Sequence, residues 1–288
     1  MCRIIFHIPL KIDFNLKSAS QIRPCKMIDA FKVLGYHVDI VEGDAKQRKK
    51  SIKKIKKNIS DGIKYDFLYS ESSTMPTLLT ERKHFPTHPF IDFVFFKYCK
   101  EHGIKIGLFY RDVYWCFPGY ITNWKTKIAK WFYRYDLKKY NELVDVLFVP
   151  SKEMIEFLPI KMKPRIEELP SGAEIKFTDL KSTNHNKQIE IFYVGGIGSH
   201  YDLSMLVKVI GESQNFHLTL CCRQSDWELI KDKYNRILSA NVSIVHKSGK
   251  ELDQYYESAD LCALFVAPSL YRSFAMPFKL MEFLGRGV

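Results

Sequence analysis

The feature of this sequence that most restricts its fold is a repeated alternation of short apolar runs with longer amphipathic segments. Runs such as 2–8, 65–70 and 104–110 are rich in aliphatic and aromatic residues and have the length of buried strands. The segments between such runs place apolar residues at helical spacing. Because strands separated by helices form parallel sheets covered on both faces, the sequence predicts an α/β protein.

The alternation occurs twice, once in each half of the chain. In the first half we expect strands at 2–8, 36–41, 65–70, 104–110 and 144–151, and helices at 22–34, 89–103 and 123–143 with a basic helix that ends near residue 60. In the second half we expect strands at 189–196, 216–222, 241–246 and 260–266, and helices at 201–213, 225–238 and 250–259 with a further helix from 277.

The segment 158–188 separates the two halves. It contains three prolines and the polar stretch KSTNHNKQ, which predict a domain boundary near 172–187. We therefore expect a first domain at 1–172 and a second at 173–288, both doubly wound. Two such domains facing each other form a cleft, and ligands of this fold class bind at the carboxyl ends of the strands.

The cysteines and the hydropathy pattern indicate the cellular compartment in which the protein is expected. Seven cysteines are scattered without a CxxC pair, as is typical of buried thiols in a reducing environment. The apolar run at the amino terminus is too short for a secretory signal, and no stretch approaches the roughly 20 apolar residues of a spanning helix. We expect a cytoplasmic protein that can also bind peripherally at the inner face of a membrane.

The formal charge of +12 is concentrated in the first half. Residues 1–150 carry 27 Lys and Arg against 15 Asp and Glu, whereas residues 151–288 carry 17 of each. The run KQRKKSIKKIKK at 46–57 is either a solvated helix face or a surface that attracts phospholipid headgroups or a polyprenyl-phosphate carrier. No nucleic-acid motif accompanies the charge, so we expect no nucleic-acid partner.

Glycines follow the first expected strand of the second half, in YVGGIGSHYD at 193–202. Glycines between a strand and a helix let the backbone approach a diphosphate, with helix amides directed at it. The alternative interpretation is a tight strand–helix turn without a ligand.

Two further loops contain charged residues at carboxyl ends of expected strands. In AMPFKLMEFLGRG (275–287), Pro277 suits the first turn of a helix, and Lys279 and Glu282 share one helix face. They can bind the ribose and the phosphate of a nucleotide, or they can form an ordinary ion pair on the surface. In FYRDVYW (109–115), Arg111 can clamp a ligand and Asp112 can accept a proton, or the two can form a structural ion pair and a cap.

The final loop, with the pattern P-x-K-x-x-E-F-L-x-x-G, resembles the donor-site signature of GT-B glycosyltransferases of the group 1, family 4-like type. The run ASQIRPCKMIDAFKVLGYHVDIVEG and the segments IGLFYRDVYWCFPGY and VDVLFVPSKEM resemble bacterial capsule and surface-polysaccharide transferases. The resemblance covers essentially the whole chain. It implies two Rossmann-like domains facing a cleft and transfer of a sugar from a nucleotide-sugar to a glycan or polyprenyl-phosphate-linked acceptor, or binding of the donor without turnover.

The resemblance also implies roles for individual positions. Glu282 would bind the ribose hydroxyls, and Arg111 with Asp112 would contact the transferred sugar. The phosphate end of the donor site would be formed by Gly195, Gly196, Ser199, Pro277, Phe278 and Lys279. The acceptor side would include Ser18, Ser20 and Arg23.

This sequence departs from the family pattern at several places. Phe274 stands where retaining members often have a first Glu, and an Arg–Asp pair replaces the usual His–Asp pair. The cations that clamp the diphosphate in many relatives are missing, and Arg223 could substitute for them. The chain stops at RGV, so we expect a second domain that is truncated at its carboxyl terminus. No Asp-x-Asp occurs, so we expect no metal and no cofactor.

Overall fold

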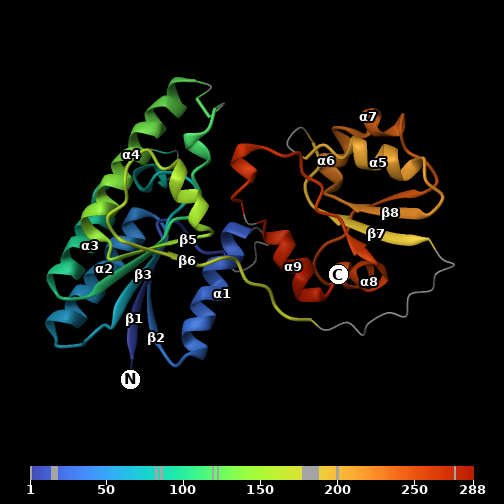
Figure 1. Cartoon of the computed structure of the whole chain (residues 1–288). Helices are drawn as coiled ribbons and strands as arrows, with labels where there is room; N and C mark the ends of the chain where they lie inside the picture. Colours follow the sequence, from blue (N-terminus) through green and yellow to red (C-terminus); the bar gives the residue numbers. More distant parts are fainter. Residues whose placement is uncertain are drawn as a thin grey trace. The chain divides into compact units, whose positions relative to one another are not determined.

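The computed structural model describes residues 2–13, 19–81, 84, 87–118, 120–121, 123–176, 188–198, 201–275 and 277–288; of Ala19 and Ser20 it describes the backbone alone. The chain divides into two compact units (Figure 1). The first comprises Met1–Pro170 with Phe274–Met276, and the second comprises Ser171–Ser273 with Pro277–Val288.

The first unit is built on a six-stranded parallel sheet with the strand order β2-β1-β3-β4-β5-β6. Its strands are β1 (Arg3–His7), β2 (His37–Val41), β3 (Phe67–Glu71), β4 (Lys105–Phe109), β5 (Val146–Val149) and β6 (Arg165–Glu168). Its helices are α1 (Ala19–Val33), α2 (Ala45–Ser60), α3 (Ile91–Glu101) and α4 (Trp124–Leu143), with short 3₁₀ turns at Thr77–Leu79, Tyr114–Cys116 and Lys152–Phe157.

Local sequence explains where two of these helices begin. Asp44 accepts a hydrogen bond from the backbone N–H of Gln47, whose side chain accepts one from the N–H of Asp44, and this capping box starts α2. Asn123 and Thr126 cap α4 in the same reciprocal way. Both helices therefore begin at a residue whose side chain satisfies otherwise unpaired backbone donors.

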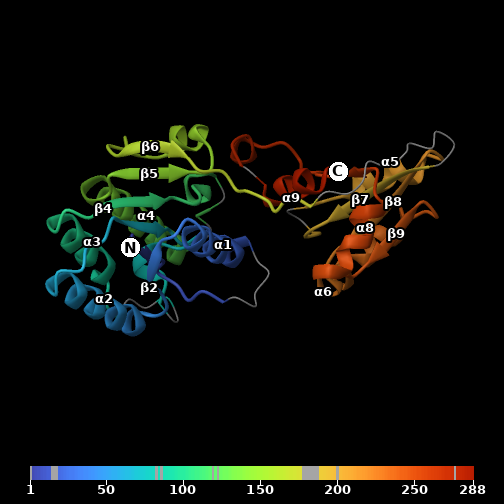
Figure 2. The same cartoon turned by 90° about the horizontal axis from the view of Figure 1, so that it is seen from below.

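The strand order reverses between β1 and β3, so the helices before and after the reversal lie on opposite faces of the sheet. Right-handed crossovers in opposite directions place α1 on one face of the sheet and α2, α3 and α4 on the other (Figures 1 and 2). Ile28 of α1 packs on Phe6, Tyr69 and Phe109 of the sheet. The carboxyl ends of β1 and β3 therefore form the topological switch point at which doubly wound sheets bind ligands.

The second unit contains a four-stranded parallel sheet with the order β10-β7-β8-β9, which reverses between β7 and β10. The strands are β7 (Ile189–Val194), β8 (Phe216–Cys221), β9 (Val242–Val245) and β10 (Leu261–Cys262). The helices are α5 (Ser204–Gly211), α6 (Gln224–Glu228), α7 (Lys231–Asn235), α8 (Asp253–Ser258) and α9 (Phe278–Arg286), with 3₁₀ turns at Gly249–Leu252 and Leu270–Arg272.

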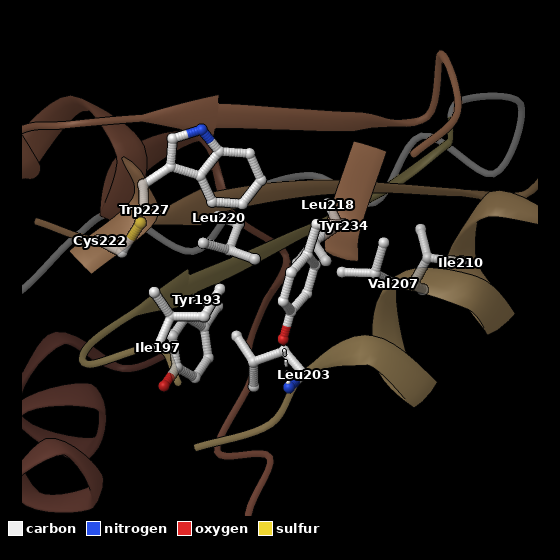
Figure 3. Close-up of a cluster of buried hydrophobic side chains, with 10 residues drawn as sticks. All are labelled: Tyr193, Ile197, Leu203, Val207, Ile210, Leu218, Leu220, Cys222, Trp227 and Tyr234. Atoms are coloured by element: carbon white, nitrogen blue, oxygen red, sulfur yellow. Dashed lines mark hydrogen bonds between the residues drawn. The ribbon is translucent and has the colours of Figure 1, made fainter. Parts of the chain in front are cut away.

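One buried cluster of the second unit fixes the loop that follows β7. Leu218 and Leu220 of β8 pack with residues of α5, α6 and α7 (Figure 3). Ile197 and Leu203, which flank the loop, are buried in the same cluster, and the hydroxyl of Tyr234 accepts a hydrogen bond from the Leu203 N–H at 2.8 Å. The loop between β7 and α5 is thus held at both ends by the core.

The structure corrects three of the expected elements. The segment 158–188, expected to connect the halves, contains the edge strand β6, whose single apolar residue and flanking prolines hid it. The helix expected at 225–238 is split into α6 and α7, with Leu229 exposed at the break. The strand expected at 260–266 pairs with β7 only at Leu261 and Cys262, because it lies at the sheet edge.

Candidate functional site

A buried carboxylate lies at the switch point of the first unit. Glu71 ends β3, is fully buried, and its Oε2 accepts a hydrogen bond from the Arg111 guanidinium at 2.8 Å. Arg23 of α1 approaches the other oxygen of Glu71 at 3.5 Å, and its guanidinium lies 3.6 Å from the ring centroid of Phe109. We call Arg23, Glu71 and Arg111 the Glu71 cluster.

In the Glu71 cluster, burial and the neighbouring charges shift the pKa values of Glu71 and Arg111 in opposite directions. Burial raises the pKa of Glu71, and the charges of Arg111 and Arg23 act against that rise. Burial also lowers the pKa of Arg111, while Glu71 raises it. The hydroxyl of Tyr69 donates to Glu71 at 3.3 Å. The cluster thus sets two arginines, one predicted to face the acceptor and one predicted to contact the sugar, around a single carboxylate.

A second buried polar network supports the same strand ends. The Nε2 of His7 lies 2.9 Å from Asp92, and its Nδ1 lies 2.8 Å from the Ser70 hydroxyl. Since a carboxylate only accepts, Nε2 donates to Asp92. Arg48, the one inward-facing cation of the basic run, donates to both oxygens of Asp92 at 2.9 and 3.2 Å. The network fixes the carboxyl ends of β1 and β3.

Asp112 is held by the backbone next to it. Its Oδ1 accepts hydrogen bonds from the N–H groups of Val113 at 2.6 Å and Tyr114 at 3.0 Å. These bonds precede the 3₁₀ turn at 114–116, whose N-cap residue is Val113, and they hold the carboxylate in one orientation. Arg111 forms its ion pair with Glu71, and the catalytic roles of Arg111 and Asp112 stay predictions.

In the second unit, Gly195, Gly196 and Gly198 follow β7 at the switch point, in a loop that we call the glycine loop. Gly195 donates its N–H to the carbonyl of Cys221 at 3.1 Å, and the Gly196 carbonyl accepts from the Tyr193 hydroxyl at 2.7 Å. A Cβ on Gly195 would lie 3.0 Å from that hydroxyl, so the loop has little room for a side chain there. Gly198 has a φ of +144°, which favours glycine.

Two arginines lie near strand ends of the second unit. The Arg272 guanidinium lies 5.2 Å from the ring centroid of Tyr201, which pairs with Gly198 in the glycine loop. Arg223, proposed from the sequence as a phosphate contact, is exposed at the start of α6 after β8. The structure thus adds Arg272 as a cation beside the glycine loop.

Helix α9 carries Lys279 and Glu282, the predicted donor-binding pair. Lys279 donates to the Oε2 of Glu282 at 2.7 Å, and the Tyr256 hydroxyl of α8 donates to its Oε1 at 2.8 Å. The Glu282 side chain is 29% exposed. A carboxylate has about four acceptor positions, so these two bonds leave capacity for a diol. Pro277 is the N-cap residue of α9, and Phe278 is its first helical residue.

Phe274 is counted with the first unit and is buried there. Its ring contacts those of Phe117 and Phe157, with centroids 5.7 and 4.8 Å away, and its carbonyl accepts from the Ser151 hydroxyl at 3.2 Å. Phe274, which stands where the sequence resemblance places a glutamate of retaining members, is thus a buried apolar residue.

Comparison with known proteins rests on structure, because neither a protein-family model nor a curated protein matches the sequence. The structure of Anabaena Alr3699/HepE in complex with UDP-glucose is 12% identical with a TM-score of 0.52, covering 93% of this chain and 75% of that chain. Its UDP complex is 10% identical with a TM-score of 0.57, covering 93% and 75%. The structure described as trehalose-6-phosphate from E. coli bound with UDP-2-fluoro glucose is 10% identical with a TM-score of 0.55, covering 98% and 81%.

The chain has the GT-B fold. The solved structures compared above hold UDP-glucose, UDP or UDP-2-fluoro glucose. In this GT-B chain, the Glu71 cluster lies at the switch point of the first Rossmann-like unit, and the glycine loop lies at that of the second. The expected α/β class and GT-B architecture are confirmed, whereas truncation of the second domain remains an expectation.

Some predicted site residues cannot be placed. Ser18, Ser199 and the side chain of Ser20 lie outside the described residues. Sequence reasoning missed Glu71 and Tyr256. The polar run that follows the expected strand 65–70 was a signal for Glu71, whereas Tyr256 looked like any other apolar position of a short amphipathic helix.

The described residues contain no group of three or more His, Cys, Asp or Glu side chains arranged to hold a metal ion, and metal independence stays a prediction. None of the described helices has the length and hydropathy needed to cross a bilayer.

Proposed function

We propose that this chain is a glycosyltransferase that moves a sugar from a nucleotide-sugar to a glycan or a polyprenyl-phosphate-linked acceptor during surface-polysaccharide synthesis. The reaction would take place in the cytoplasm, at the inner face of the membrane. The observation that carries the proposal is the group formed by Tyr256 of α8 with Lys279 and Glu282 of α9 in a GT-B fold. The resemblance of residues 275–287 to the GT-B donor-site signature supports it, as does the fold shared with the UDP-glucose complex of HepE.

The donor would bind to the second unit. Glu282 would accept hydrogen bonds from the ribose hydroxyls, with Tyr256 and Lys279 holding its carboxylate in place. The glycine loop at Gly195 and Gly196 would approach the diphosphate. Departure of the nucleoside diphosphate creates negative charge, which preorganised cations and helix amides stabilise without a metal.

The acceptor would bind to the basic first unit. The Glu71 cluster would orient Arg111 toward the transferred sugar, and Asp112 would serve as the base if the reaction inverts the anomeric centre. A second candidate function is donor binding without turnover. The replacement of a glutamate by Phe274 and of the family His–Asp pair by Arg111–Asp112 favours this alternative.

A nucleotide screen tests the donor site. Ligands that bind the folded state raise the unfolding midpoint, and saturation near 100 Kd adds about 2.7 kcal/mol. We expect one of UDP, GDP, CMP and dTDP to raise the midpoint by several degrees, and Glu282→Ala to abolish that rise. Glu251→Ala, which breaks an exposed pair with Lys247 in the same unit, is the matched control and should retain it. An equal rise in wild type and Glu282→Ala would contradict the assignment of Glu282.

A further inference from the structure

The outward face of α4 carries an apolar stripe that the core does not use. The inward face buries Tyr133, Leu137 and Tyr140 in the first unit. An amphipathic helix normally presents polar side chains on the opposite side. Here that side presents three large apolar side chains at successive helical turns: Trp124, Ile128 and Trp131, which are 68%, 46% and 62% exposed.

A groove continues this stripe toward α3. The groove has a volume of about 530 Å³ and lies between α3 and α4. Trp131 stacks on Tyr135 with centroids 6.1 Å apart, and Tyr135 in turn lies 6.3 Å from Phe90. Phe90 and Val94 are both more than half exposed. We call the surface formed by Phe90, Val94, Trp124, Ile128, Trp131 and Tyr135 the α3–α4 face.

Basic residues outnumber acidic ones around the α3–α4 face. Four basic residues of α4 are exposed, and the groove is lined by Lys97, Lys100 and Lys139 together with the carboxylates Glu101 and Glu142. The four are Lys125, Lys127, Arg134 and Lys138. Of the two acidic residues of α4, Asp136 is buried and only Glu142 is exposed. An apolar centre with a cationic border complements a bilayer with anionic headgroups. Two copies of this face would instead repel each other.

We infer that the α3–α4 face docks onto an anionic lipid bilayer. The basic run at 46–57 was the first candidate for this role, but it buries its apolar residues Ile52 and Ile55, and its exposed residues are lysines and Gln47. It can attract a membrane at long range, and it has no side chain to insert. The inference identifies the membrane-contact surface of the proposed function. It is tested without nucleotide or acceptor, so either proposal can fail while the other stands.

Tryptophan fluorescence gives a direct test, because only two of the four tryptophans are exposed. Trp115 and Trp227 are buried, whereas Trp124 and Trp131 lie on the α3–α4 face. Vesicles of phosphatidylglycerol and phosphatidylcholine should shift the emission to shorter wavelength, and brominated lipid should quench it. Vesicles of phosphatidylcholine alone should do neither. An emission spectrum that anionic vesicles leave unchanged would overturn the inference.

Vesicle co-sedimentation of three double variants locates the contact. Trp124→Ala/Trp131→Ala and Lys127→Glu/Lys138→Glu should each weaken binding about tenfold or more. Lys49→Glu/Lys53→Glu on α2 makes the same charge change and should weaken it less than about threefold. The inference fails if the α2 variant loses as much binding as the α4 variants. It also fails if size-exclusion chromatography shows a wild-type dimer that the tryptophan variant converts to a monomer.

Discussion

Replacing Glu71 with alanine is expected to lower the free energy of unfolding by about 3–5 kcal/mol. Glu71 is fully buried and pairs with Arg111 at 2.8 Å and with Arg23 at 3.5 Å. Both arginine side chains are less than 15% exposed. Removal of the carboxylate leaves two guanidiniums facing each other without their shared counter-charge, and water cannot fully solvate them. Urea unfolding followed by circular dichroism measures the loss.

A control and a double-variant cycle separate this effect from a general loss of charge. Asp61→Ala removes an exposed partner of Lys57 and should change stability by less than about 1 kcal/mol. Arg111→Ala combined with Glu71→Ala should lower the free energy of unfolding by clearly less than the sum of the two single changes, because the ion pair is lost only once. Additive costs would show that Arg111 and Glu71 are not energetically coupled, contrary to the geometry.

The second large effect is a fall in stability between about pH 4 and pH 7 that originates at Asp136. This residue of α4 is buried; one oxygen accepts from the Thr77 N–H at 2.7 Å, and the other has no hydrogen-bond partner among the described residues. Burial raises the pKa of Asp136 to about 7, against the opposing hydrogen bonds of Thr77. The ordinary value, which applies to the unfolded chain, is 3.8.

The direction of the effect follows from proton binding. Below about pH 4 both states hold the proton, and Asp136 carries no penalty. Between pH 4 and pH 7 the folded state keeps the proton that the unfolded state releases, so stability falls as the pH rises. Three pKa units correspond to about 4 kcal/mol, and above pH 7 the penalty is constant.

Asp136→Asn tests this account, because the amide keeps an oxygen acceptor for Thr77 and cannot ionise. We expect the unfolding free energy of wild type to fall more between pH 5 and pH 8 than that of the variant, by about 2–3 kcal/mol. Histidines titrate in the same range, but they are identical in both proteins and cancel in the comparison. Parallel stability curves for the two proteins would contradict a raised pKa at Asp136.

The sequence predicts the fold well and the site only in part. Apolar periodicity indicates most strands and helices because burial repeats along a strand or a helix face. It misses β6, where Ile166 is the only apolar residue, because an edge strand needs little burial. It also extends the strand at 260–266 beyond Cys262, because an apolar run does not reveal where pairing stops.

Site residues are harder because their partners are distant in the sequence. The pairing of Lys279 with Glu282 follows from helical spacing, but Tyr256 reaches Glu282 from another helix. Arg23 and Arg111 were assigned to different roles, and no local pattern indicates that both meet Glu71. Such contacts depend on the order of strands in the sheet, which a single sequence does not specify.

The central claim is that this chain transfers sugar from a nucleotide-sugar, and turnover tests it most directly. The measurement is release of nucleoside diphosphate from a panel of nucleotide-sugars, with and without vesicles that carry a polyprenyl-phosphate-linked glycan. The account predicts acceptor-dependent release from one nucleotide class, which Glu282→Ala abolishes and Glu251→Ala leaves intact. Nucleotide binding without release would establish the non-catalytic alternative, and the absence of both binding and release would contradict the proposed function.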